Sequence, residues 1–189
     1  MHRILRAQLR TRRIEDHVIL SSAGLGATSG RQIHPHTARA LSELSVDPRD
    51  HLAHRISERR LAMADLVLTV CRSLDDPLIE MRAEVRDRLF TVIEFGRLVS
   101  RLDPLPGLPE QLVRAAAKGR TETGVVTRPV MAAGDLAADG DLAADDDLAA
   151  PLAAEVQEHE RLIRRIDGSA RDISRALSAC LRTPVSGVA

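Results

Sequence analysis

Short runs of consecutive apolar residues alternate with longer stretches in which apolar residues recur every three or four positions. The short runs predict buried strands, and the longer pattern predicts amphipathic helices. Because strands alternate with helices, we expect an α/β fold with three layers, in which helices flank a parallel twisted sheet. The expected strands cover residues 18–20, 65–70 and 89–92, and the expected helices cover residues 2–13, 36–45, 57–63, 73–86, 94–101, 110–118 and 152–181.

The apolar pattern divides the chain into four parts. We expect an α/β core over residues 1–118 and a C-terminal helix over residues 151–182 that packs back on it. Residues 119–150 repeat Asp-Leu-Ala-Ala and are rich in Ala, Asp and Gly, a composition that cannot bury an apolar face. We therefore expect a flexible insertion there, and a tail over residues 183–189.

Composition narrows the possible partners. The 27 basic and 27 acidic residues balance, and Phe90 and Phe95 are the only aromatic residues, which disfavours a nucleic-acid partner. No apolar run is long enough to span a membrane. Cys71 and Cys180 are too few for a disulfide scaffold, so we expect a cytoplasmic protein. Lys118 is the only lysine among many arginines, a bias typical of a GC-rich bacterial genome.

A set of local motifs, in a fixed order over residues 3–102, resembles the low-molecular-weight protein tyrosine phosphatase family. The motifs begin with Ser22-Ala23-Gly24 at the end of the first expected strand. They continue with Gly30, Pro35, the helix of residues 38–41, Asp47, residues 51–56, the strand of residues 64–70 and the run of residues 90–95. The resemblance implies a four-stranded parallel sheet wrapped by helices, and hydrolysis of a phosphate monoester, usually phosphotyrosine. It implies neither a cofactor nor a metal.

Family members use a loop of the form Cys-x5-Arg-Ser/Thr between their first strand and first helix. Its cysteine thiolate attacks phosphorus, and its arginine binds the phosphate oxygens. That loop is missing here, because Pro77 stands six residues after Cys71 and Ser186 stands six residues after Cys180. Residues 1–10 resemble the helix that follows the loop. The resemblance therefore places the nucleophile and the central first strand before Met1.

We expect the 189 residues alone to be inactive and to fold poorly, since a missing central strand leaves backbone groups of both neighbours unpaired. A start codon placed too far downstream is the first explanation, and a relic gene is the second. A non-catalytic phosphatase-like binding module is the alternative function, and a relative of the arsenate reductases is a more distant one. For a full-length active form, we expect a phosphotyrosine protein or another phosphate monoester as partner.

The family's general acid is an aspartate directly before a proline at the head of the last helix. The matching proline is Pro151, but Ala150 occupies the aspartate position. Asp147 is therefore the remaining candidate general acid. Asp103 precedes Pro104, but this pair follows the preceding helix too closely for that role.

The remaining candidates have both a functional and a structural interpretation. Ser22 matches the serine that supports the family's phosphate loop, and it equally fits a hydroxyl that caps a strand end. Cys71 matches the first redox cysteine of the arsenate reductases, but Leu78 occupies the position of the second, so we expect a small buried residue. His34, His36, His51 and His54 lack the spacing of known zinc motifs, so we expect surface or helix-start histidines and no metal.

Overall fold

Helices surround a small parallel sheet in residues 1–103, 108–122 and 156–182, which are the residues that the structure, a computed structural model, describes. The α-helices are α1 (His2–Thr11), α2 (Pro35–Glu43), α3 (Glu58–Met63), α4 (Asp75–Met81), α5 (Val92–Ser100), α6 (Pro109–Glu122) and α7 (Val156–Arg182). The strands are β1 (Val67–Thr69) and β2 (Leu89–Thr91), and the 3-10 turns are η1 (Glu15–His17), η2 (Arg72–Leu74) and η3 (Ala83–Arg88). The α/β fold class with flanking helices is confirmed.

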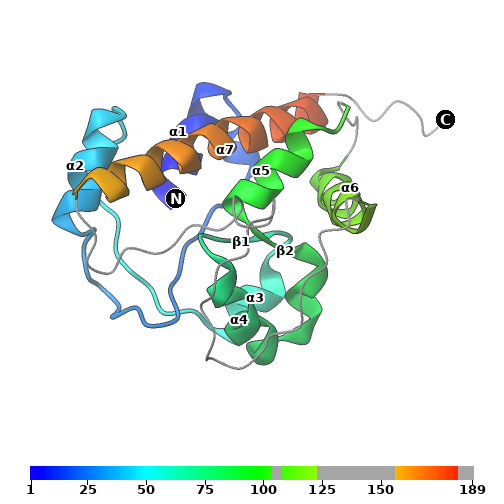
Figure 1. Cartoon of the computed structure of the whole chain (residues 1–189), viewed down its shortest axis with the longest axis horizontal. Helices are drawn as coiled ribbons and strands as arrows, with labels where there is room; N and C mark the ends of the chain where they lie inside the picture. Colours follow the sequence, from blue (N-terminus) through cyan, green and yellow to red (C-terminus); the bar gives the residue numbers. More distant parts are fainter. Residues whose placement is uncertain (104–107, 123–155, 183–189) are drawn as a thin grey trace, which may run out of the picture.

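The two strands lie between two layers of helices (Figure 1). Strands β1 and β2 are parallel, with Val67 opposite Leu89 and Thr69 opposite Thr91. Helices α1, α5 and α7 lie on one side, and α3 and α4 lie on the other. The main core fills the first side and centres on Phe90 and Phe95, while a smaller core contains Leu61, Leu78, Val85 and Leu89.

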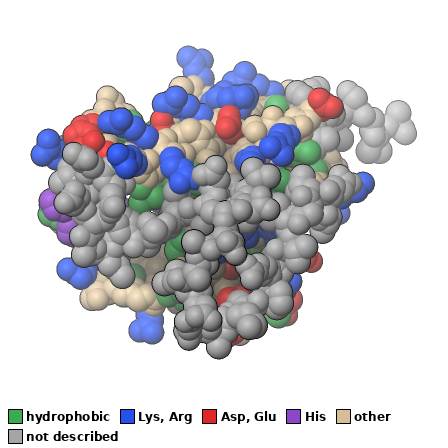
Figure 2. Space-filling model, viewed as in Figure 1, with side chains coloured by type: hydrophobic (Ala, Val, Ile, Leu, Met, Phe, Trp, Pro, Cys, Tyr) green, Lys and Arg blue, Asp and Glu red, His purple; other side chains and the backbone are tan. Residues whose placement is uncertain are grey.

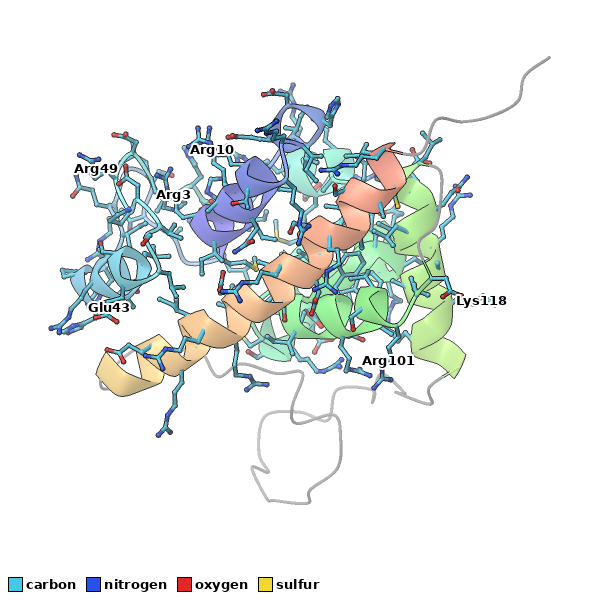
Figure 3. All side chains as sticks on the ribbon, turned by 90° about the horizontal axis from the view of Figure 1, so that it is seen from above. Arg3, Arg10, Glu43, Arg49, Arg101 and Lys118 are labelled. Atoms are coloured by element: carbon cyan, nitrogen blue, oxygen red, sulfur yellow. The ribbon has the colours of Figure 1, made fainter. Side chains whose placement is uncertain are left out.

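Helix α7 joins the first layer together, since it contacts α1, α2, α5 and α6. It crosses α1 and α5 diagonally (Figure 3). The predicted apolar stripe of α1 is confirmed, because Ile4, Leu5 and Leu9 are buried. Gln8, on the same face, donates a hydrogen bond of 2.8 Å to Asp167 of α7. On α7 the buried stripe includes Ile163, Ile166 and Ile173.

The outer surface of this layer is rich in arginine (Figure 2). Several of these arginines form ion pairs with carboxylates on the same helix or on the adjoining 3-10 turn η1. Arg6 and Arg10 of α1 both bind Glu15, and Arg175 binds Asp172 of α7. Paired surface charges of this kind contribute little to stability.

The predicted strand over residues 18–20 is wrong. Val18 has extended dihedral angles, but no strand forms there, and the Ile19 side chain is 102% exposed. The only sheet-like pairing nearby is an isolated bridge between Gly24 and Arg55. An apolar run forms a strand only when a neighbouring strand supplies hydrogen bonds, and none of the described residues does so here.

The strand predicted over residues 65–70 is shorter than expected. Strand β1 covers Val67–Thr69, and Val67 and Leu68 are half-buried instead of fully buried. Among the described residues, β1 has a strand on one edge only, so its side chains are less covered than those of an interior strand. The strand predicted over residues 89–92 ends at Thr91, because the side chains of Thr91 and Glu94 form a capping box that begins α5 at Val92.

Other predicted boundaries also move. The helix predicted over residues 73–86 is interrupted at Arg82, whose extended backbone turns the chain so that Val85 is buried in the smaller core. Helix α6 continues past Lys118 to Glu122, so the first residues of the predicted insertion are helical. Of the predicted C-terminal helix, residues 152–155 lie outside the described residues, as do the rest of the insertion and the predicted tail.

Candidate functional site

Charged and hydroxyl side chains gather where β1 and β2 end. Because the strands are parallel, Thr69 and Thr91 lie at the same edge of the sheet. The segment after β1 supplies Arg72 and Asp75, and the first turn of α5 supplies Glu94. Helix α6 contributes Arg120. We call Thr69, Arg72, Asp75, Glu94 and Arg120 the charged cluster.

Glu94 and Arg120 form the centre of the charged cluster. The Glu94 side chain is 1% exposed, and Arg120 Nε donates to its Oε1 at 2.8 Å. Arg120 Nη2 also donates to the backbone carbonyl oxygen of Leu89 at 2.6 Å, and the guanidinium lies 3.9 Å from the centre of the Phe90 ring. A buried carboxylate is tolerated when its charge is paired and hydrogen-bonded. Arg120 thereby attaches α6 to the end of β2.

Arg72 is the second cation that faces Glu94. Its Nη2 lies 3.8 Å from Glu94 Oε1, beyond a normal hydrogen bond but within ion-pair range. Two guanidinium groups therefore surround one buried carboxylate. The carboxylate of Asp75 supplies the second negative charge of the charged cluster, so its two cations and two anions balance.

Asp75 accepts a hydrogen bond of 2.9 Å from the Thr69 hydroxyl. Burial raises the pKa of its carboxyl from 3.8 to about 6, although the Thr69 hydrogen bond and the charge of Arg72 act in the opposite direction. A carboxyl with a pKa near 6 exchanges its proton close to neutral pH. Among the described carboxyl groups at this edge of the sheet, Asp75 is suited to proton transfer because its pKa is raised toward neutral pH.

The raised pKa of Asp75 predicts a pH dependence of stability. Below about pH 4 both states hold the proton, and the favourable contribution of the neutral, buried carboxyl is complete. Between about pH 4 and 6 the unfolded chain loses this proton while the folded protein keeps it, so stability falls until the folded carboxyl also ionises near pH 6. We expect the melting temperature of wild type relative to Asp75→Asn to decrease from about pH 4 to about pH 7. A pH-independent difference between the two proteins would contradict this.

Neither cysteine is placed as a nucleophile. Cys71 is buried between β1 and η2, and its Sγ lies 3.1 Å from the Ser73 Oγ. Its predicted burial is confirmed. Cys180 is buried in α7, and burial raises the pKa of its thiol. A nucleophilic cysteine needs access to substrate, and burial denies this access to both thiols.

The sequence matches the family described as low molecular weight phosphotyrosine protein phosphatase over residues 2–104, more than half of the chain. The chain belongs to this family. No curated protein matches the sequence. The match covers both strands and four members of the charged cluster, Thr69, Arg72, Asp75 and Glu94, but not Arg120.

Solved phosphatase structures share the fold of this family member. A structure described as a protein tyrosine phosphatase has 18% sequence identity and a TM-score of 0.59, with 99% of this chain and 87% of that chain covered. The tyrosine phosphatase AmsI of Erwinia amylovora has 16% identity and a TM-score of 0.60, with coverage of 93% and 82%. Wzb of Vibrio vulnificus, solved with benzylphosphonate, has 14% identity and a TM-score of 0.58, with coverage of 92% and 86%. At these identities the likeness shows the fold alone.

Of the predicted site residues of this phosphatase-family chain, the structure describes only Ser22, so it does not show whether they lie together. Ser22 is half-buried at the end of the extended segment, and its hydroxyl makes no hydrogen bond within the described part of the chain. Asp147 and Ala150, the candidate and expected positions of the general acid, lie outside the described residues. The roles of Ser22 and Asp147 therefore stay predictions.

The histidines lie in pairs. His34 is the N-cap of α2, where its Nδ1 accepts from the backbone N–H of His36 at 3.4 Å. The rings of His2 and His51 are 5.3 Å apart. In residues 1–103, 108–122 and 156–182, no group of three or more His, Cys, Asp or Glu side chains is arranged to hold a metal ion. No helix of these ranges is long and apolar enough to cross a membrane.

Sequence analysis missed the charged cluster. Part of it had a readable signal, since Thr91-x-x-Glu94 before an apolar stretch is a capping-box pattern. Arg120 had no such signal, because it lies in a segment whose composition suggested an insertion. Its partner Glu94 is 26 residues away in the sequence, and only the packing of α6 reveals the pair.

Proposed function

We propose that this protein is a low-molecular-weight phosphatase-like protein whose residues 1–189 do not hydrolyse phosphate monoesters by themselves. The burial of both cysteines, neither followed by an arginine at the sixth position, carries this proposal. The substrate class that the family supports is a phosphotyrosine protein or another phosphate monoester. Hydrolysis then requires a cysteine and an arginine from outside these 189 residues.

The chemistry explains why the residues present are insufficient. In thiolate catalysis a sulfur–phosphorus bond forms while the bond from phosphorus to the leaving oxygen breaks, and an acid gives that oxygen a proton. Water then attacks phosphorus, which releases phosphate and the thiolate. Cys71 is not suited to begin this sequence, because its sulfur is buried beside the Ser73 hydroxyl and Pro77 stands where the phosphate-binding arginine is needed.

The experiment that tests this proposal measures release of p-nitrophenolate from p-nitrophenyl phosphate by the purified protein of residues 1–189. We expect no release above the uncatalysed rate across about pH 5 to 8, where thiolate phosphatases and their acids act. The matched control is Cys71→Ser, which should give the same trace as wild type. Turnover by wild type that disappears in Cys71→Ser would contradict the proposal.

We also propose a cytoplasmic location. The support is that both cysteines are free and buried, as in proteins of a reducing compartment. Fractionation of the source cells, with an antibody against this chain, tests the location directly. Recovery in a membrane or secreted fraction would contradict it.

A further inference from the structure

An irregular segment, residues 47–56, lies beside the first turn of α1. It forms neither helix nor strand, and none of its residues is fully buried. Backbone hydrogen bonds hold its second half, since Gly24 donates to the carbonyl oxygen of His54 at 2.9 Å and Gly30 donates to that of Ala53 at 2.9 Å. A segment without fully buried side chains is retained by a small number of contacts, so those contacts determine whether it stays in place.

Two side-chain contacts join this segment to the first turn of α1. Arg3 Nε donates to the carbonyl oxygen of Asp47 at 2.7 Å. The rings of His2 and His51 have their centroids 5.3 Å apart and their planes inclined by 39°. We call His2 and His51 the histidine pair. Arginine keeps its charge in neutral and acidic solution, whereas histidine changes its charge between about pH 5 and 8. Of the two contacts, the histidine pair is therefore the one that responds to pH.

The charges that act most strongly on the histidine pair, besides the two rings themselves, are all cationic. They are the amino group of Met1, Arg3 of α1 and His54 of the segment. The two carboxylates of the segment, Asp47 and Asp50, act instead on Arg49, which Asp47 binds at 3.0 Å. A positive charge on either ring of the pair is therefore close to like charges.

Protonation of the histidine pair is unfavourable in the folded protein. His2 Nδ1 is buried and has no hydrogen-bond partner among the described residues, so a proton on this atom would make it a donor without an acceptor. Burial lowers the pKa of His2 from its ordinary value of 6.5, a hydrogen bond with the Leu20 backbone acts in the opposite direction, and the charge of His51 lowers it further. Burial also lowers the pKa of His51. Both rings are therefore neutral at neutral pH and gain charge only in acid.

We propose that the histidine pair is an acid-sensitive switch, which holds residues 47–56 against α1 while both rings are neutral and releases them when both rings are charged. Two like charges this close repel each other, and each charged ring is better hydrated once the segment moves away. Protonation of histidine clusters in mildly acidic solution changes protein interfaces by the same physical effect. The switch requires no hydrolytic activity, so it goes beyond the proposed function.

Acid removes the stabilising contribution of the histidine pair. Well above pH 6.5 the rings are neutral in both the folded and the unfolded protein, and the contribution is complete. As the pH falls through 6.5, the released and unfolded states bind protons that the closed state binds only at lower pH. The stability of the closed state therefore decreases toward acid. Asp75 has the opposite effect on stability, so variants of the histidine pair separate the two contributions.

The test is an NMR titration of the protein of residues 1–189 from about pH 8 to about pH 5. The ring signals of His2 and His51 report their protonation, and the amides of Gly24, Gly30 and Ile56 report whether the segment is in place. We expect both rings to titrate below pH 6.5. Over the same range these amides should lose about tenfold or more of their exchange protection, after correction for the intrinsic pH dependence of exchange. Amides in the middle of α5 should keep their protection.

Single substitutions separate the histidine pair from the rest of the protein. His2→Gln and His51→Gln each leave one ring without its charged neighbour, so the loss of protection in acid should fall to less than about threefold. His2→Glu replaces repulsion by attraction, so the segment should be better protected at about pH 5.5 than at about pH 8. His17→Gln is the matched control, since His17 is an exposed histidine of η1, and it should retain the full acid response.

The amino group of Met1 has its own control. Burial lowers its pKa from 8.0 to about 6, so it also titrates in this range. N-terminally acetylated protein lacks this charge and should retain the acid response.

Three results would overturn the switch. One is titration of either wild-type ring at or above pH 6.5, a measurement that does not depend on whether a variant folds. Another is an unchanged acid response in both glutamine variants. The third is loss of the response on acetylation, which would assign it to Met1. None of them bears on whether the 189 residues hydrolyse phosphate monoesters.

Discussion

Glu94→Gln should lower the free energy of unfolding by about 3–5 kcal/mol, the range measured when one partner of a buried ion pair is removed. The substitution keeps the side-chain volume but leaves the Arg120 guanidinium, 14% exposed, without its closest negative charge. Urea unfolding, followed by circular dichroism, measures the change in midpoint.

The chain offers a matched control for Glu94. Glu84 lies 3.4 Å from Arg82, but its side chain is 67% exposed. Glu84→Gln should change the stability by less than about 1 kcal/mol, as for other exposed pairs. The double variant Glu94→Gln with Arg120→Met should be more stable than Glu94→Gln alone, since it removes the unpaired charge. Equal losses for Glu84→Gln and Glu94→Gln would contradict a structural role for the pair.

Gly96→Ala should destabilise the protein by about 1–3 kcal/mol, the usual effect of overpacking a filled interface. A Cβ at this position would lie 2.7 Å from Ser169 Cβ and 3.0 Å from Ser169 Cα. Because one of these atoms is backbone, α5 and α7 must separate to admit the methyl group. Thermal and urea unfolding of the variant measure the loss.

Gly168, the neighbour of Ser169 on α7, provides the control for Gly96. A Cβ at Gly168 meets no atom within 4 Å, so Gly168→Ala should stabilise the protein by about 0.5–1 kcal/mol through helix propensity. Adding Ser169→Gly to Gly96→Ala should restore part of the loss, since the Ser169 side chain is removed but its Cα remains. A neutral Gly96→Ala would show that the two helices are not in close contact.

Local patterns predicted the elements that depend on local interactions. The amphipathic helix α1 and the two strands near residues 67 and 89 were visible in the sequence. The apolar run of residues 18–20 looked equally strong, but it forms no strand, because its hydrogen-bond partner is not among the described residues. Strand formation depends on a neighbour, which a pattern within one segment does not show.

The sequence was less informative about the site. The spacing around Cys71 and Cys180 indicated that neither begins a phosphate-binding loop, and this stays a prediction. The pairing of Glu94 with Arg120 and the burial of Asp75 depend on where α6 and η2 lie relative to the sheet, and no local pattern specifies that. Long-range pairs of charged residues become visible only when the elements are placed together.

Helix α7 has a consequence for how the protein is made. Its contacts with α1 include the hydrogen bond from Gln8 to Asp167, 159 residues apart in the sequence. During synthesis, residues 156–182 leave the ribosome after every other described residue. Until then the apolar stripe of α1 lacks its packing partner α7 and is exposed to water. Contacts of such long sequence separation slow folding, and the exposed stripe is a surface that chaperones recognise on nascent chains.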